Sequence, residues 1–201
     1  MISFSNRQLT SWLFIASMVF IMAILQLLDI DNLRYQHEWF DQGEYWRILS
    51  AHWIHVNWRH WLLNSAGLIL CMGIASPVWS IWRWVIYHLV LASGISLLFT
   101  MLNPELHWYV GYSGVLFGIF SLAAFDLYAR EKLIASLLLV GMMVKIALEQ
   151  TGDLNVTTRD FIDSPVIIDA HLYGLCLALV IELVSRTYKM YRQTDHSRRA
   201  D

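Results

Sequence analysis

The sequence predicts an all-α, multi-pass membrane protein, and three observations support that fold class. Hydrophobic residues make up 57% of the 201-residue chain and charged residues only 15%, an apolar share above that of ordinary soluble domains. Several apolar runs approach or reach the roughly 20 residues with which a helix crosses a hydrocarbon core of about 30 Å. Trp and Tyr gather at many edges of these runs, as interfacial side chains do. We therefore expect one compact domain, residues 1–201, with the lipid bilayer as its solvent.

Six apolar runs predict six membrane-spanning helices. They lie near residues 12–28, 58–75, 82–102, 110–128, 133–148 and 165–185, and a basic tail follows at 186–201. In this arrangement nine Lys and Arg residues fall on the side of the two termini and four on the other side, with Lys145 inside a span. Because Lys and Arg are enriched in cytoplasmic segments, both termini and the tail are expected in the cytoplasm.

Small residues at four-residue spacing predict that the fourth and sixth spans pack closely. The fourth span opens with Gly111-Tyr112-Ser113-Gly114 and carries Gly118 four residues later. The sixth span carries Ala170-His171 and then Gly174 and Ala178 on the same face. Small side chains at this spacing let two helix backbones approach each other. Both spans start on the outer side, so polar residues near their starts can share one depth.

Ser113 and His171 are the candidate catalytic residues. A serine hydroxyl is a weak nucleophile until a base within hydrogen-bond reach accepts its proton, and a neutral imidazole has suitable basicity near pH 7. A Ser–His dyad meets that need without an aspartate. Each residue alone fits a plain packing or polar role, but ionisable side chains at membrane depth are costly and mark function more often than in soluble cores. We predict Ser113 as nucleophile and His171 as general base.

A third cluster leads into the second span. It contains Glu44-x-x-Arg47, His55, His60 and Asn64. His60 and Asn64 are four residues apart and share a helix face. Their N–H groups could both donate to the oxyanion that forms when a serine attacks a carbonyl. The sequence thus offers candidate oxyanion donors in addition to the dyad.

These motifs, in this order in spans two, four and six, resemble the rhomboid family of intramembrane proteases, and most closely its bacterial rhombosortase branch. The resemblance implies a six-helix rhomboid-like bundle in the bacterial inner membrane, with its active site opening toward the periplasm. It also implies that Ser113 is the nucleophile, that His171 is the base, and that His60 and Asn64 line the oxyanion site. Supporting, non-catalytic roles are implied for Glu44, Arg47, His55, Gly111, Gly114, Gly118 and Gly174. Phe117 stands where that branch would be expected to have a polar residue.

The implied partners are membrane-anchored protein substrates, cut near the outer face, and in the rhombosortase branch these are exported proteins with a C-terminal Gly-Gly tail. No metal or organic cofactor and no nucleic-acid partner is expected, and the oligomeric state and the choice between hydrolysis and transfer stay open. A catalytically inactive rhomboid-like protein that binds transmembrane helices is the main alternative. A metal site on His52, His55 and His60 is a second alternative, but these three histidines would spread over a wide arc of a helix.

Overall fold

Helices dominate the computed structural model, which describes residues 5–75, 79–151 and 155–198, and the all-α prediction is confirmed. The long helices are α1 (Asn6–Leu25), α4 (Trp58–Ala75), α5 (Ile81–Leu102), α6 (Ser113–Leu127), α7 (Lys132–Thr151) and α9 (Asp169–Arg198). Shorter elements connect them: α2 (Ile30–Leu33), β1 (Tyr35–Gln36), the 3-10 helix η1 (His37–Trp39), α3 (Arg47–Ser50), β2 (Trp108–Tyr109) and α8 (Asn155–Ile162).

Four helices in the described part of the chain, α1, α5, α7 and α9, are long and apolar enough to cross a membrane. This confirms a multi-pass membrane protein. Helix α6 is apolar but has only 15 residues. Helix α4 has 18 residues but carries Arg59, His60 and Asn64, which lower its hydropathy. Of the six long helices, the two that are shorter or less apolar are therefore α6, which begins at the candidate nucleophile, and α4, which carries the candidate oxyanion donors.

Helix boundaries differ from the apolar runs where local backbone chemistry intervenes. Helix α1 begins at Asn6 because Ser5 and Gln8 form a reciprocal capping box at its start. Helix α6 begins at Ser113, since Gly111 has a φ of 130° that an α-helix cannot contain. Helix α9 continues to Arg198 instead of ending near residue 185, so the described part of the basic tail is helical. Residues 199–201 lie outside the described ranges.

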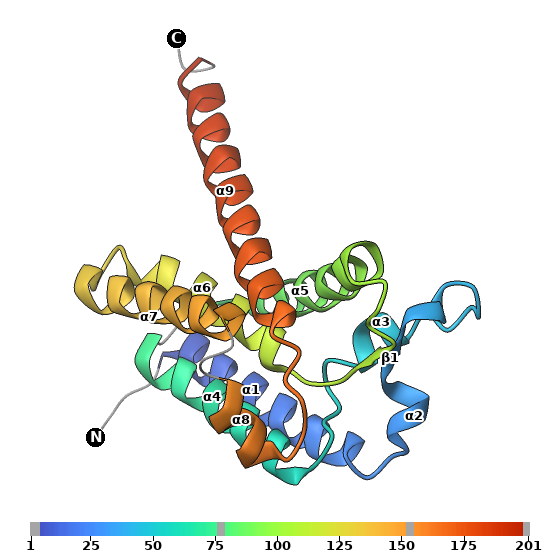
Figure 1. Ribbon diagram of the computed structural model, residues 1–201. Coiled ribbons are helices and arrows are strands. Elements are labelled where there is room, and N and C mark those ends of the chain that lie inside the picture. The colour runs from blue at the N-terminus through green and yellow to red at the C-terminus, as the bar shows by residue number, and fades with distance from the viewer. Residues whose placement is uncertain (1–4, 76–78, 152–154, 199–201) are drawn as a thin grey trace.

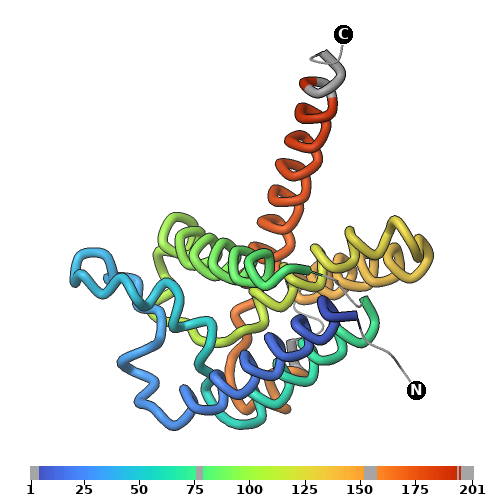
Figure 2. Tube along the Cα trace, turned by 180° about the vertical axis from the view of Figure 1, so that it is seen from behind, coloured from blue at the N-terminus to red at the C-terminus, as the bar shows by residue number. Residues whose placement is uncertain are grey.

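Helix α6 is the central element of the bundle. It contacts α4, α5, α7 and α9, and ten of its 15 residues are buried. In Figure 1, α5, α6 and α7 lie beside one another, α1 and α4 lie on one side of them, and α9 rises from the group. The C-terminal part of α9 projects beyond the other helices in both views (Figures 1 and 2). The N-terminal end of α6 therefore lies among other elements and not at an exposed tip.

The long loop between α1 and α4 holds the segment that leads into α6. Strand β1 pairs with β2 in antiparallel register, with Tyr35 opposite Tyr109. The N–H of Gly111 donates to the carbonyl of Ala51 at 2.9 Å. Two backbone links from this loop thus fix the approach to Ser113, which begins α6 only two residues after Gly111.

Candidate active site

Three glycines set the distance between α6 and α9. A Cβ added to Gly174 would lie 2.0 Å from the carbonyl oxygen of Gly114, and one added to Gly114 would lie 2.8 Å from the carbonyl oxygen of Ala170. A Cβ on Gly118 would lie 3.1 Å from the carbonyl oxygen of Gly174. These backbones are in direct contact, so the spacing of small residues does what the sequence predicted for this helix pair.

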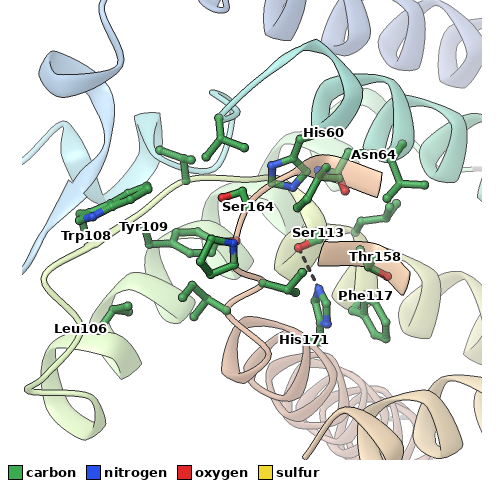
Figure 3. Close-up of a pocket in the computed structure, with 18 of the residues that line it drawn as sticks. His60, Asn64, Leu106, Trp108, Tyr109, Ser113, Phe117, Thr158, Ser164 and His171 are labelled. Carbon is green, nitrogen blue, oxygen red and sulfur yellow. Dashed lines mark hydrogen bonds between the residues drawn. The ribbon is translucent and has the colours of Figure 1, made fainter. Parts of the chain in front are cut away.

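Close helix contact brings Ser113 and His171 together. Ser113 directly precedes Gly114 on α6, and His171 directly follows Ala170 on α9. Ser113 Oγ lies 2.9 Å from Nε2 of His171, within hydrogen-bond distance (Figure 3). The histidine is only 3% exposed, whereas the serine is half-buried. This geometry suits proton transfer from the hydroxyl to the imidazole.

Two further side chains contact the His171 ring, and the sequence did not reveal either contact. Nδ1 of His171 lies 2.7 Å from Oε2 of Glu149, a side chain that is 2% exposed. Phe117 stacks on the same ring, with centroids 4.4 Å apart and planes inclined by 15°. The other carboxylate oxygen of Glu149 pairs with Lys145, one turn away on α7. The signal in the sequence that could have pointed to Glu149 is its place directly after the fifth predicted span, residues 133–148, where an acidic side chain is uncommon.

A cavity of about 510 Å³ opens beside the Ser–His pair. Its walls come from α4, α6, α7 and α8, from the segments before α6 and α9, and from the start of α9. The carbonyl of Ile162 at the end of α8 accepts a hydrogen bond of 2.5 Å from Nδ2 of Asn57, which ties α8 to the start of α4. Most of the lining is apolar; the polar and charged side chains on it include Ser113, His171, His60, Asn64, Lys145, Thr158 and Ser164. Such a concave site with a few polar groups suits the binding of a substrate segment.

His60 and Asn64 line this cavity as neighbours on α4. Figure 3 shows them on one side of Ser113 and His171 on the other. Nδ2 of Asn64 and Nδ1 of His60 are buried and have no hydrogen-bond partner among the described residues. A Cβ on Gly111 would lie 2.7 Å from Cε1 of His60, so the His60 ring fits against the backbone just before the serine. Buried polar groups without partners are uncommon and call for a functional explanation.

His55 and His52 lie behind this wall in the loop before α4. The ring of His55 meets that of His60 edge to face, with centroids 4.9 Å apart, and burial lowers the pKa of His55 well below its usual value. Nε2 of His52 hydrogen-bonds Ser96 Oγ at 3.0 Å, and burial lowers the pKa of His52 to about 3. Within residues 5–75, 79–151 and 155–198, no three His, Cys, Asp or Glu side chains are grouped as metal ligands would be.

Glu44 and Arg47 lie in the long loop between α1 and α4, and neither lines the cavity. Arg47 Nε donates to Glu44 Oε2 at 2.5 Å, and its Nη1 donates to the carbonyls of Asp31 and Arg34 at 2.8 Å each. The Arg47 pairing lowers the pKa of the Glu44 carboxyl. One buried guanidinium thus joins three parts of the loop, as a supporting residue would.

Fold and site together define a multi-pass membrane protein with a Ser–His pair on the wall of a cavity. A model of the rhomboid domain matches residues 42–187, and the chain belongs to the rhomboid family. A protein of Bacillus subtilis (strain 168), named "Putative rhomboid protease YdcA", is 27% identical over 139 residues. That alignment covers 67% of this chain and 64% of the relative, so the chain spans a little under two thirds of the relative's length.

Proposed function

We propose that this protein is an intramembrane serine endopeptidase that cleaves membrane-anchored proteins with a Ser113–His171 pair. The observation that carries the proposal is the 2.9 Å contact between Ser113 Oγ and His171 Nε2 on the wall of a cavity. Membership of a family of rhomboid domains supports the same conclusion. The named relative is described only as a protease of this family and adds no substrate.

The proposed chemistry is acyl transfer through the serine. His171 accepts the proton as Ser113 Oγ attacks the scissile carbonyl, and the carbonyl oxygen becomes an oxyanion. His60 and Asn64 line the same cavity and present buried N–H capacity without partners in the described chain, which suits them to stabilise this oxyanion. The imidazolium then gives its proton to the leaving amine, and the acyl-enzyme is resolved by water or by another nucleophile.

The proposed substrates are exported proteins held in the membrane by a C-terminal segment that follows a Gly-Gly sequence. An intramembrane protease must accept its scissile bond as extended backbone, and glycine makes local unwinding of a helix cheap. Phe117 stacked on His171 and the close fit of His60 against Gly111 leave bulky groups on both sides of the serine. A substrate without side chains at the cut site fits such surroundings best.

The proposed location is the bacterial inner membrane, with both termini in the cytoplasm and the cavity open toward the periplasm. The excess of Lys and Arg on the side of the termini supports this orientation. Water must reach an acyl-enzyme for hydrolysis, and an imidazolium is costly in hydrocarbon. Both needs are met if the cavity opens to the aqueous side.

The test is co-expression of the native protein with a membrane-anchored reporter that carries a Gly-Gly tail. A second reporter carries Ala-Ala in place of Gly-Gly, and Ser113→Ala and His171→Ala are matched inactive variants. We expect release of the Gly-Gly reporter by the native protein alone and little release of the Ala-Ala reporter. Equal release of both reporters would keep the protease and remove the Gly-Gly substrate class.

The alternative is a non-catalytic rhomboid-like protein that binds transmembrane helices. It predicts that neither reporter is released and that the reporter co-purifies equally with the native protein and with Ser113→Ala. Release that survives both Ser113→Ala and His171→Ala, with expression unchanged, would overturn the Ser–His mechanism.

A further inference from the structure

We propose that Glu149 completes the catalytic hydrogen-bond chain as a positioning residue that fixes the tautomer of His171 and stabilises its charged form. This inference rests on the proposed protease function and adds a third member to the Ser113–His171 pair. The sequence alone suggested a dyad with no acid.

The hydrogen-bond pattern sets the protonation of the imidazole. An ionised carboxylate only accepts hydrogen bonds, so the 2.7 Å contact of Glu149 Oε2 requires a proton on His171 Nδ1. In a neutral ring Nε2 then carries the free lone pair, and it is this atom that lies 2.9 Å from Ser113 Oγ. The hydroxyl therefore donates to the imidazole, which is the direction that the attack requires.

Lys145 makes a buried carboxylate tolerable at this position. Its ammonium group pairs with the other carboxylate oxygen of Glu149, one helical turn away on α7. The lysine side chain is 41% exposed and reaches the cavity wall, whereas Glu149 is 2% exposed. A buried acid that lost its partners would pay a large desolvation cost, so the ion pair keeps the charge of Glu149 available to His171.

Two neighbouring side-chain hydrogen bonds link the ends of α7 and α5 to the start of α9. Gln150 Nε2 donates to one carboxylate oxygen of Asp169 at 3.2 Å, and Asn103 Nδ2 donates to the other at 2.7 Å. Asp169 begins α9 two residues before His171, and Gln150 directly follows Glu149. The Glu149–His171 contact thus lies beside two further hydrogen bonds that join α7, α5 and α9.

One proton moves from Ser113 through His171 to the leaving amine. The serine proton moves to His171 Nε2 as Oγ bonds to the carbonyl carbon, and the ring becomes an imidazolium. Glu149 keeps its negative charge and stabilises that cation through Nδ1–H without accepting the proton. The Nε2 proton then passes to the leaving amine, and the ring returns to its starting tautomer.

The first test measures the reaction of Ser113 with a fluorophosphonate probe, which needs no knowledge of the substrate. We expect Glu149→Gln to slow labelling by about 10²- to 10⁴-fold, because an amide can present its N–H and select the wrong tautomer. Glu149→Asp should recover part of the rate. Glu182→Gln is the matched control, since Glu182 forms a similar i, i+4 pair with Arg186 on α9 and does not line the cavity.

With the Gly-Gly reporter peptide in detergent micelles, Glu149→Gln should lower kcat and leave KM nearly unchanged. A purely structural role would instead lower the thermal unfolding temperature and the fraction of reactive protein together. If the native protein fails to react with the probe, or Ser113→Ala reacts as fast, the protease proposal itself fails. If the native protein reacts and folded Glu149→Gln reacts at the same rate, only the role of Glu149 is overturned.

A second measurement needs no Glu149 variant. ¹⁵N spectra of histidine-labelled native protein, with the His171 signals identified by their loss in His171→Gln, report which ring nitrogen carries the proton. In the neutral ring we expect the proton on Nδ1 and none on Nε2. An Nε2–H tautomer in the native protein would contradict the proposed orientation.

Discussion

The carbonyl oxygen of Gly114 lies so close to Gly174 that a Cβ on Gly174 would be 2.0 Å away. A real Cβ cannot occupy that position, so any larger residue must push α6 and α9 apart. Ser113 directly precedes Gly114, and His171 directly follows Ala170, which also contacts Gly114. A larger residue at position 174 should therefore lower both the stability of the protein and the reactivity of Ser113.

Gly174→Ala should therefore destabilise the protein by about 1–3 kcal/mol, as overpacking does, and slow probe labelling of Ser113. Thermal unfolding in detergent micelles and the labelling rate measure the two effects. Gly141→Ala on α7 is the matched control, since a Cβ there would meet nothing within 4 Å. That change should leave labelling intact and stabilise the helix by up to about 1 kcal/mol. Equal behaviour of the two variants would contradict the tight contact.

Asn64→Leu should lower kcat by about 10²- to 10³-fold with little change in KM, because an oxyanion donor acts mainly in the transition state. Steady-state cleavage of the reporter peptide measures this. Ser65→Ala is the control, since that hydroxyl is also buried and unpartnered within the described chain but does not line the cavity. An Asn64→Leu enzyme with native kcat would remove Asn64 from the oxyanion site.

Arg47→Lys should destabilise the loop between α1 and α4 by about 2–3 kcal/mol. One ammonium group cannot replace the three hydrogen bonds of Arg47, and each partly buried group left unpaired costs about 1 kcal/mol. Limited proteolysis of the loop and thermal unfolding report the loss. Arg186→Lys on the exposed end of α9 should stay within about 0.5 kcal/mol of the native protein. If Arg47→Lys is as stable as the native protein, the loop does not depend on the hydrogen bonds of Arg47.

Acid should destabilise the folded protein through His52. Its pKa is about 3 in the folded state, against an ordinary value near 6.5, because burial disfavours the charged ring. Between these two pH values the unfolded chain binds a proton that the folded chain refuses, so the free energy of unfolding falls as pH falls, by about 1.4 kcal/mol per pH unit for this residue alone. His55, whose pKa is also lowered by burial, adds to the effect over the same range.

The measurement is thermal unfolding in detergent between pH 7 and pH 4. His52→Gln removes one titrating group and should flatten the pH dependence. Gly141→Ala removes none and should leave it unchanged. A native slope in His52→Gln would show that His52 does not carry this acid sensitivity.

The sequence by itself determined the all-helical membrane fold and the family. Long hydrophobic runs indicate helices that lie in lipid, and small residues four apart in the fourth and sixth spans indicate that the two helices pack closely. Ser113 and His171 could be named because few residue types activate a hydroxyl, and these two lay near the same ends of two close-packed spans. Motifs of this kind can be recognised from neighbouring residues alone.

Only the tertiary structure decided what surrounds those two residues. Glu149 lies 22 positions before His171, and no periodicity links them, so their 2.7 Å contact depends on how α7 docks at the start of α9. The same is true of Phe117, whose ring covers His171 where a polar side chain was expected. The helices also begin at other residues than the apolar runs, because hydropathy defines a run, whereas Gly111 and the Ser5 capping box determine helix starts through backbone geometry. Contacts between distant segments depend on packing, which no local pattern records.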